Sequence, residues 1–171
     1  SRYDPQSDDG PLMLNKLHLN NVFCDQGGMY ISGLRSNALL RFDGKGLGVM
    51  STLPEGIHNA RPFSDGVLFN DTAKDVVRVE GPGRRIAMRV PKFAPHKLTH
   101  MKLDDTRIAR QGFGRGLCQI SETEIAAGSS PSSITVYDLD TQKPTKVINL
   151  SMDVRNAIHG LEVWPFDWPQ T

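Results

Sequence analysis

One short motif recurs along the chain, and it constrains the fold more than any other feature. It first occurs at Leu17–Asn20, and altered copies follow at Gly56–Asn59, Gly114–Leu117 and Ile158–Leu161. Each copy opens a short apolar segment and carries a His or an Arg in the same slot. A chain that repeats one segment in this way is expected to repeat one structural unit.

The spacing of the copies indicates the size of that unit. The anchor side chains stand 40, 57 and 44 residues apart, in the order His18, His58, Arg115 and His159. Forty to forty-five residues is about the length of one four-stranded propeller blade. The longer middle gap predicts an insertion, and Pro91–Gln111, which is rich in Pro, Lys and His, supplies it.

Each repeat also contains the pattern of four short strands. In the first repeat, apolar Asn21–Cys24 is followed by a tight turn and by a second apolar segment, Met29–Ser32. Ala38–Phe42 and Gly48–Ser51 follow as the third and fourth strands, and no segment of the chain shows a sustained helical period. The sequence therefore predicts an all-β fold, a β-propeller or a partial propeller.

Three full blades and one additional inner strand account for most of the chain. We place a flexible lead-in at 1–11 and a single domain at 12–171, with blades at about 17–56, 57–90 and 112–151, an inserted loop at 91–111 and a partial blade at 157–165. Propellers have about four to eight blades, so three would leave strand edges and apolar faces uncovered. We expect a missing segment or dimerisation to complete the ring, in preference to closure as a small ring.

The composition excludes several classes of partner. The 171 residues carry a net charge of +1, so no strong field selects nucleic acid or an anionic membrane. No apolar run approaches the roughly 18 residues of a membrane-spanning helix. Cys24 and Cys118 both fall in predicted buried strands, where we expect reduced thiols in a cytoplasmic protein. A small-molecule substrate or a protein partner remains.

The recurring motifs resemble those of an uncharacterised, mostly bacterial family of β-propeller proteins. The family motifs run His-Leu-Asn-Gly, Pro-His-Ser-Pro-Arg and Thr-Arg-Gly-Leu. The matching residues in this chain are His18–Asn20, then His58 with Arg61, and then Arg115–Leu117. The Val-Asp-Leu-x-Thr-Gly turn and the closing Val-Leu-Pro of the family are matched more loosely, by residues 137–141 and 163–165.

The resemblance runs from about Leu17 to Pro165 and has two departures. Asn21 replaces the Gly of the first motif, and the slot of His159 is not a His in the family pattern. Members of the family are longer, with N-terminal strands that have no counterpart in this sequence. The resemblance implies a propeller fold and no known activity.

In a propeller the inner strands run along a central channel, so one residue per blade converges on the axis. Three imidazoles there, His18, His58 and His159, would hold a divalent first-row metal and leave one position open. Arg115 would bind a carboxylate or phosphate. We add Arg61, Asn20 and Asn59 to the predicted substrate-binding set. Asn20, Asn59 and Asp71 are also expected to orient the imidazoles.

Purely structural roles compete with this interpretation. A His that opens an inner strand can simply bond to the neighbouring backbone, and Arg115 can pair with a buried carboxylate. His96 and His100 form a His-x-x-x-His pair, but Pro91 and Pro95 favour a loop over a helical metal site.

Glycine-rich residues 111–116 superficially resemble a phosphate-binding loop. No Lys-Ser/Thr and no helix follow them, so we exclude a nucleotide cofactor. Two functional hypotheses remain. One is a metal-assisted enzyme of the hydrolase or lyase type that acts on an anionic substrate. The other is a non-catalytic propeller platform for protein–protein interaction.

Overall fold

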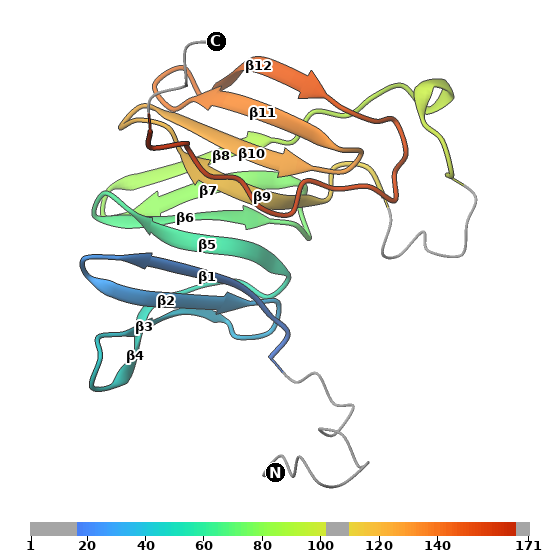
Figure 1. The fold of residues 1–171 in the computed structure, drawn as a ribbon. Coiled ribbons are helices and arrows are strands. Elements are labelled where there is room, and N and C mark those ends of the chain that lie inside the picture. Colours follow the sequence, from blue (N-terminus) through green and yellow to red (C-terminus); the bar gives the residue numbers. More distant parts are fainter. Residues whose placement is uncertain (1–16, 102–109, 167–171) are drawn as a thin grey trace, which may run out of the picture.

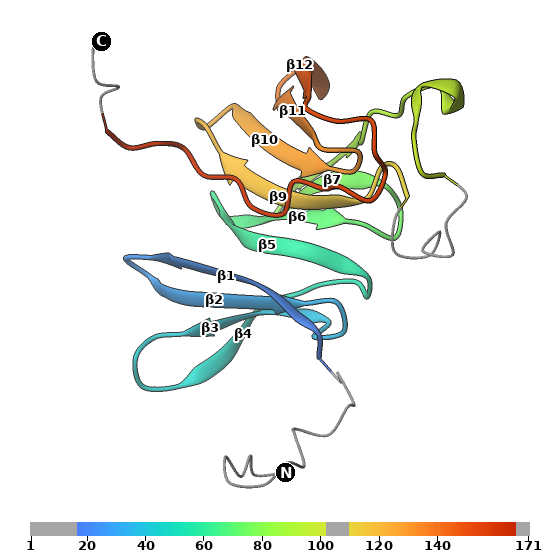
Figure 2. The same cartoon turned by 45° about the vertical axis from the view of Figure 1, so that its right-hand side comes forward.

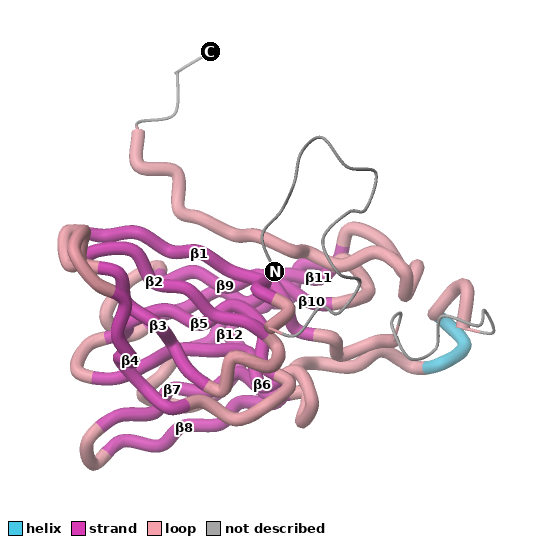
Figure 3. Tube along the Cα trace, turned by 90° about the horizontal axis from the view of Figure 1, so that it is seen from below, coloured by secondary structure: helices cyan, strands magenta, loops and turns pink. Residues whose placement is uncertain are grey.

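The computed structural model describes residues 17–101 and 110–166. The predicted lead-in, residues 1–11, and residues 102–109 of the predicted insertion lie outside this range. Twelve strands and one short helical turn, η1 (Pro95–Lys97), are found among the described residues. In Figure 3 this turn lies apart from the strands. The described residues contain no helix long and apolar enough to cross a membrane.

The strands form three four-stranded antiparallel sheets, each with its strands in chain order. We call these sheets blade 1, blade 2 and blade 3. Blade 1 contains β1 (Leu19–Asp25), β2 (Gly28–Gly33), β3 (Ala38–Phe42) and β4 (Leu47–Thr52). Blade 2 contains β5 (Ile57–Phe63), β6 (Gly66–Asp71), β7 (Val76–Gly81) and β8 (Arg84–Arg89). Blade 3 contains β9 (Gly114–Gln119), β10 (Glu124–Ser129), β11 (Ser133–Asp138) and β12 (Lys143–Asn149).

The blades are stacked side by side in chain order, with blade 2 in the middle (Figures 1 and 2). The inner strand β5 of blade 2 lies against β1 and β2 of blade 1, and β9 of blade 3 lies against β5 and β6. The predicted all-β partial propeller with three four-stranded blades is therefore confirmed.

Residues 157–166, which we call the tail, run across blade 3 beside β9 and β10 (Figure 1). The Gly116 amide donates to the Ile158 carbonyl at 2.8 Å, and the Ile158 amide donates to the Ser129 carbonyl at 3.4 Å. The tail thus occupies the place expected of a further inner strand, although it forms no regular strand in this structure.

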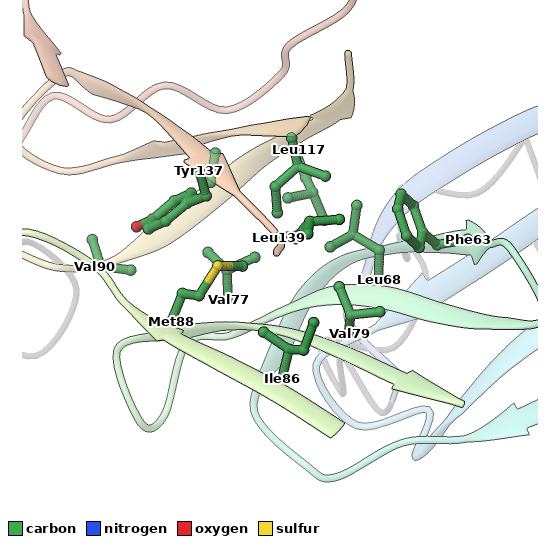
Figure 4. Close-up of a cluster of buried hydrophobic side chains, with 12 residues drawn as sticks. Phe63, Leu68, Val77, Val79, Ile86, Met88, Val90, Leu117, Tyr137 and Leu139 are labelled. Carbon is green, nitrogen blue, oxygen red and sulfur yellow. The ribbon is translucent and has the colours of Figure 1, made fainter. Parts of the chain in front are cut away.

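Two apolar clusters join the blades. Tyr30 and Leu39 of blade 1 pack with Ile57, Val67 and Phe69 of blade 2. The larger cluster joins blade 2 to blade 3, as Figure 4 shows, and includes Phe63, Leu68, Val77, Val79, Ile86, Met88, Leu117, Ile125, Tyr137 and Leu139. Blade 2 is covered on both faces, which explains why the successive residues 67–71 of β6 are all buried.

Polar side chains complete the junctions, because neighbouring inner strands do not form a ladder with one another. The Asn21 side-chain amide of blade 1 donates to the Ala60 carbonyl of β5 at 3.1 Å. The fully buried Asn70 of blade 2 donates to the carbonyls of Arg115 and Gly116 in β9, at 3.2 and 3.1 Å. These contacts satisfy backbone carbonyls that would otherwise be buried without a partner.

The two cysteines differ in exposure. Cys118 is buried and Cys24 is exposed, so the prediction that both are core thiols is wrong for Cys24. The reason lies in the packing of β1. Val22 and Cys24 point to the face of blade 1 that has no neighbouring blade, whereas Phe23 packs towards the cluster between blades 1 and 2.

We predict that Asn70→Asp lowers the free energy of unfolding by about 2–3 kcal/mol, because a buried donor facing two carbonyls becomes a third acceptor. Urea denaturation measures this change. Gln119→Glu is the matched control, since Gln119 also donates to a carbonyl, that of Ser121, but in an exposed position. We expect the control to change stability by less than about 0.5 kcal/mol. Equal losses in both variants would contradict the assigned role of Asn70.

Candidate functional site

A pocket of about 450 Å³ opens at the end of the blades where each inner strand begins. Its lining includes three of the four anchors, His18, His58 and Arg115. Arg110 and Phe113, from the segment between blades 2 and 3, complete its wall. We call this cavity the axial pocket.

The fold brings the anchors together because each inner strand carries an irregularity at the same place. The register of β5 shifts between His58 and Ala60, and Asn59 between them has a φ of +51°. Equivalent shifts occur near the start of β1, and in β9 opposite Ala127 and Ser129. Such bulges redirect the neighbouring side chains. Here they turn the anchors towards one another at the mouth of the channel.

The two imidazoles of blades 1 and 2 meet edge to face. The ring centroids of His18 and His58 are 6.2 Å apart. The Phe113 ring lies on another side of His58, with the centroids 5.2 Å apart. His58 is itself buried, so its imidazole is enclosed by aromatic rings.

His58 is neutral at neutral pH. Burial is the main cause that lowers its pKa, from 6.5 to about 4, and the nearby Arg115, His18 and His159 lower it further. A hydrogen bond also fixes its tautomer. The Thr72 hydroxyl donates its hydrogen to the Gly114 carbonyl at 2.8 Å, so it accepts from His58 Nδ1 at 3.2 Å. The Nε2 atom of His58 therefore keeps its lone pair as an acceptor.

Arg115 joins the pocket to the tail. Its Nη1 lies 3.1 Å from both ring nitrogens of His159, and its guanidinium lies over the Phe113 ring, 4.7 Å from the centroid. Burial lowers the pKa of both Arg115 and His159. None of the ion pairs among residues 17–101 and 110–166 includes Arg115, and its buried Nε has no hydrogen-bond partner. No carboxylate of the described residues therefore compensates the charge of Arg115.

Within the described ranges, Arg110 forms an ion pair with a carboxylate, in contrast to Arg115. It pairs with Asp75 and donates to the Thr72 carbonyl at 2.6 Å. Lys92 also pairs with Asp75, at 2.8 Å. Arg110 therefore connects the segment that enters blade 3 to blade 2.

The structure does not assemble a ready metal site from these residues. No group of three or more His, Cys, Asp or Glu side chains is placed to hold a metal ion in the part of the chain that the structure describes. His18 and His58 are neighbours, whereas His159 contacts Arg115. Binding of a divalent metal by His18, His58 and His159 thus stays a prediction.

The other predicted substrate-binding residues lie outside the lining of the axial pocket. The Asn20 side-chain amide donates to the Ile57 carbonyl at 3.0 Å, and its oxygen accepts from the Asn59 amide at 3.4 Å. Both residues thus join blade 1 to β5. Asp71, a further candidate for orienting an imidazole, instead pairs with Arg78 at 2.8 Å.

Arg61 lies further along the channel, in the middle of β5. Its guanidinium stacks on the Phe23 ring, 3.9 Å from the centroid. Its Nη1 donates to the Leu117 carbonyl at 3.4 Å and lies 3.7 Å from the exposed Glu162 carboxylate of the tail. The tail therefore places one polar side chain near each of the two channel arginines, His159 near Arg115 and Glu162 near Arg61.

Three residues of the site were not singled out from the sequence: Thr72, Arg110 and Phe113. Thr72 directly follows β6, in the second position after Asn70, and a polar residue there is ordinary for a turn. Arg110 and Phe113 precede the Gly114–Leu117 motif, where the glycines drew attention instead. His96 lies in η1, and His100 pairs with Asp153 at 3.0 Å, so the two do not contribute to this pocket.

Comparisons with known proteins add little to this description. No protein-family model and no curated protein matches the chain, so the resemblance to the bacterial propeller family stays a prediction. Among solved structures, the chain is similar to the WD40 β-propeller domain of Doa1, with a TM-score of 0.48 and 11% sequence identity. The match covers 74% of this chain and 38% of that one, so this chain spans less than half of its length.

The depressed pKa of His58 predicts a loss of stability in mild acid. The unfolded chain takes up a proton at His58 near pH 6.5, whereas the folded chain does so only near pH 4. The contribution of neutral His58 to the stability of the fold is therefore fully present above pH 6.5, and it is lost as the pH falls to 4. Allowing for solvent screening, we expect the free energy of unfolding to fall by about 1–2 kcal/mol over this window.

Urea denaturation at several pH values tests this prediction. His58→Gln should remove most of the fall, with a smaller remainder from His159, whose pKa is lowered in the same direction. His96→Gln, at an exposed position, is the control and should keep the wild-type slope. A slope unchanged in His58→Gln would show that His58 is not the group responsible.

Proposed function

We propose that the axial pocket binds a small organic anion, a carboxylate or a phosphate, through Arg115. The observation that carries the proposal is that Arg115 lines the pocket, has no carboxylate partner among the described residues, and has its Nε buried without a partner. A guanidinium in this state can gain a paired, bidentate hydrogen bond from an anion. Among residues 17–101 and 110–166, no Asp or Glu belongs to the pocket lining to oppose it.

The neighbouring groups suit an anion that also carries a hydroxyl. His58 Nε2 is an acceptor, as its tautomer shows, and can take the hydrogen of a ligand hydroxyl. Phe113 provides an apolar wall that is already stacked with His58 and Arg115. The pocket would thus orient a small hydroxy acid or a phosphate ester between Arg115 and His58.

Catalysis on this anion, by a metal-assisted hydrolase or lyase reaction, is the further step of the same proposal. With a pKa of about 4, His58 is a weak general base on its own. A bound anion would raise that pKa, and a metal would supply the activation in place of a general base. A divalent metal would polarise a substrate oxygen or activate water. Metal analysis of the purified protein by mass spectrometry tests this step: less than one tenth of an equivalent of any first-row metal would remove it.

A non-catalytic platform is the second candidate, and the uncovered faces of the outer blades favour it. Blade 1 exposes Leu19, Val22, Leu47 and Val49, and the tail exposes Trp164. Apolar patches of this kind mark interaction surfaces. A second copy of the chain, or a missing propeller half, would cover them. Sedimentation velocity separates these cases, since a second copy predicts a dimer.

We predict that Arg115→Ala weakens binding of the anion at least tenfold, because it removes a charge-assisted, bidentate contact. A panel of small hydroxy acids, phosphate esters and inorganic phosphate supplies the probes, and isothermal titration calorimetry measures their affinity. Arg89→Ala is the matched control, because Arg89 is an exposed arginine of β8 outside the pocket. Saturable binding that both variants retain would place the anion elsewhere.

The affinity should also rise as the pH falls from 7 towards 5. Burial lowers the pKa of His58 most, and Arg115 and the neighbouring histidines lower it further. An anion bound to Arg115 offsets the repulsive part of this shift. The pKa of His58 is therefore higher in the complex, and binding takes up a proton. Calorimetry in buffers of different ionisation enthalpy detects this uptake. Proton release, or an affinity independent of pH, would contradict the proposed position of the anion beside His58.

A further inference from the structure

A second and larger cavity lies at the opposite end of the channel from the axial pocket. It is a groove of about 860 Å³ between blades 2 and 3, within the range of about 300–1,000 Å³ that ligand sites occupy. The turns that end β5, β7, β9 and β11 form its walls, and Phe63, Ile86 and Leu139 lie at its base. We call it the inter-blade groove.

The two walls carry opposite charges. Blade 2 contributes Arg84 and Arg85, and blade 3 contributes Glu122 and Asp140. None of these four side chains forms an ion pair within the described ranges 17–101 and 110–166. The acidic and basic groups therefore face the same groove without neutralising one another. A ligand that fits must therefore carry a negative group for the basic wall and a positive group for the acidic wall.

Arg84 is held in place for such a contact. Its guanidinium lies 5.8 Å from the centroid of the Phe63 ring at the base of the groove, and Arg84 is only partly exposed. A cation–π contact uses the face of the guanidinium and leaves its edge hydrogens for a carboxylate. The adjacent Arg85 is exposed and adds a second positive charge to the same wall.

Neutral polar side chains line the groove beside the charged ones. Gln119, Gln142, Ser64 and Thr123 line the groove, and side-chain amides and hydroxyls can pair with the N–H and C=O groups of a peptide backbone. An open groove between two sheets accepts a linear chain more readily than a compact ligand. The lining thus combines backbone-binding groups with a basic wall and an acidic wall.

We propose that the inter-blade groove binds a linear peptide segment, with a carboxylate of the peptide on Arg84 and Arg85 and a basic side chain on Glu122 and Asp140. The carboxylate can come from an Asp or Glu side chain or from a free C-terminus. This site is independent of the axial pocket and of any reaction there.

A defined peptide library tests the proposal. We would use acetylated, fluorescently labelled hexapeptides in four classes: acidic and basic residues together, acidic only, basic only, and neutral. Each class is made with an amidated and with a free C-terminus, which separates the two sources of carboxylate. By fluorescence anisotropy, the mixed class should bind at least fivefold more tightly than either singly charged class.

Charge-reversal variants assign the binding to the groove. Arg84→Glu with Arg85→Glu should weaken binding of the best mixed peptide at least tenfold, and Glu122→Lys with Asp140→Lys should do the same. Lys143→Glu with Lys146→Glu is the matched control. It makes the same change in net charge as the arginine pair, at exposed positions of β12 outside the groove, and should change affinity less than twofold. Circular dichroism verifies that each variant is folded.

Three results would overturn the proposal. Acid-only peptides that bind as tightly as mixed ones would show a simple anion patch. An equal loss in the Lys143 and Lys146 control would show a long-range charge effect. No saturable binding by any class at millimolar concentration would show that the groove takes no peptide. Arg115→Ala should leave peptide binding unchanged, so failure of the axial-pocket proposal is distinguishable from failure here.

Discussion

The architecture depends on how polar side chains connect inner strands that do not pair. Within a blade, antiparallel ladders satisfy the backbone, but β1, β5 and β9 belong to different sheets and form no ladder with one another. Asn20 and Asn21 bond to β5, and Asn70 and Thr72 bond to β9. Each contact satisfies a carbonyl near the channel. The apolar clusters then supply the larger, less directional part of the packing.

The same constraint determines where the axial pocket lies. Thr72 bonds to β9 through its hydroxyl and to His58 through its oxygen, so one side chain both joins blades 2 and 3 and fixes an imidazole. Asn59 has a left-handed backbone conformation at the irregularity that follows His58. Such conformations cost energy and persist where the surrounding packing enforces them. The site is therefore a product of the blade junctions, and it cannot be separated from them.

The repeated motif made much of the fold, and part of the axial pocket, predictable from the sequence. The spacing of the anchors gave the number of blades and the insertion, because a blade is a unit of nearly constant length. The convergence of His18, His58 and Arg115 followed from their equivalent slots. The roles of Asn20 and Asn59 did not follow, since a polar residue beside the channel can turn towards a ligand or towards the next blade with the same sequence pattern. Only the packing of the blades distinguishes these two orientations. Here the Asn20 side chain turns towards the next blade and bonds to the backbone of Ile57 and Asn59.

The tail shows how closely the electrostatics of the channel depend on one small residue. Ile158 lies so near the backbone of β10 that a Cβ at Gly128 would be 2.6 Å from its Cγ2 atom and 2.8 Å from its carbonyl oxygen. Any side chain at Gly128 must therefore push the tail away. His159 and Glu162 would move together with it, and Arg115 and Arg61 would both lose their contacts with the tail. Because Gly128 has no side chain, the tail can lie against β10 and reach both Arg61 of blade 2 and Arg115 of blade 3.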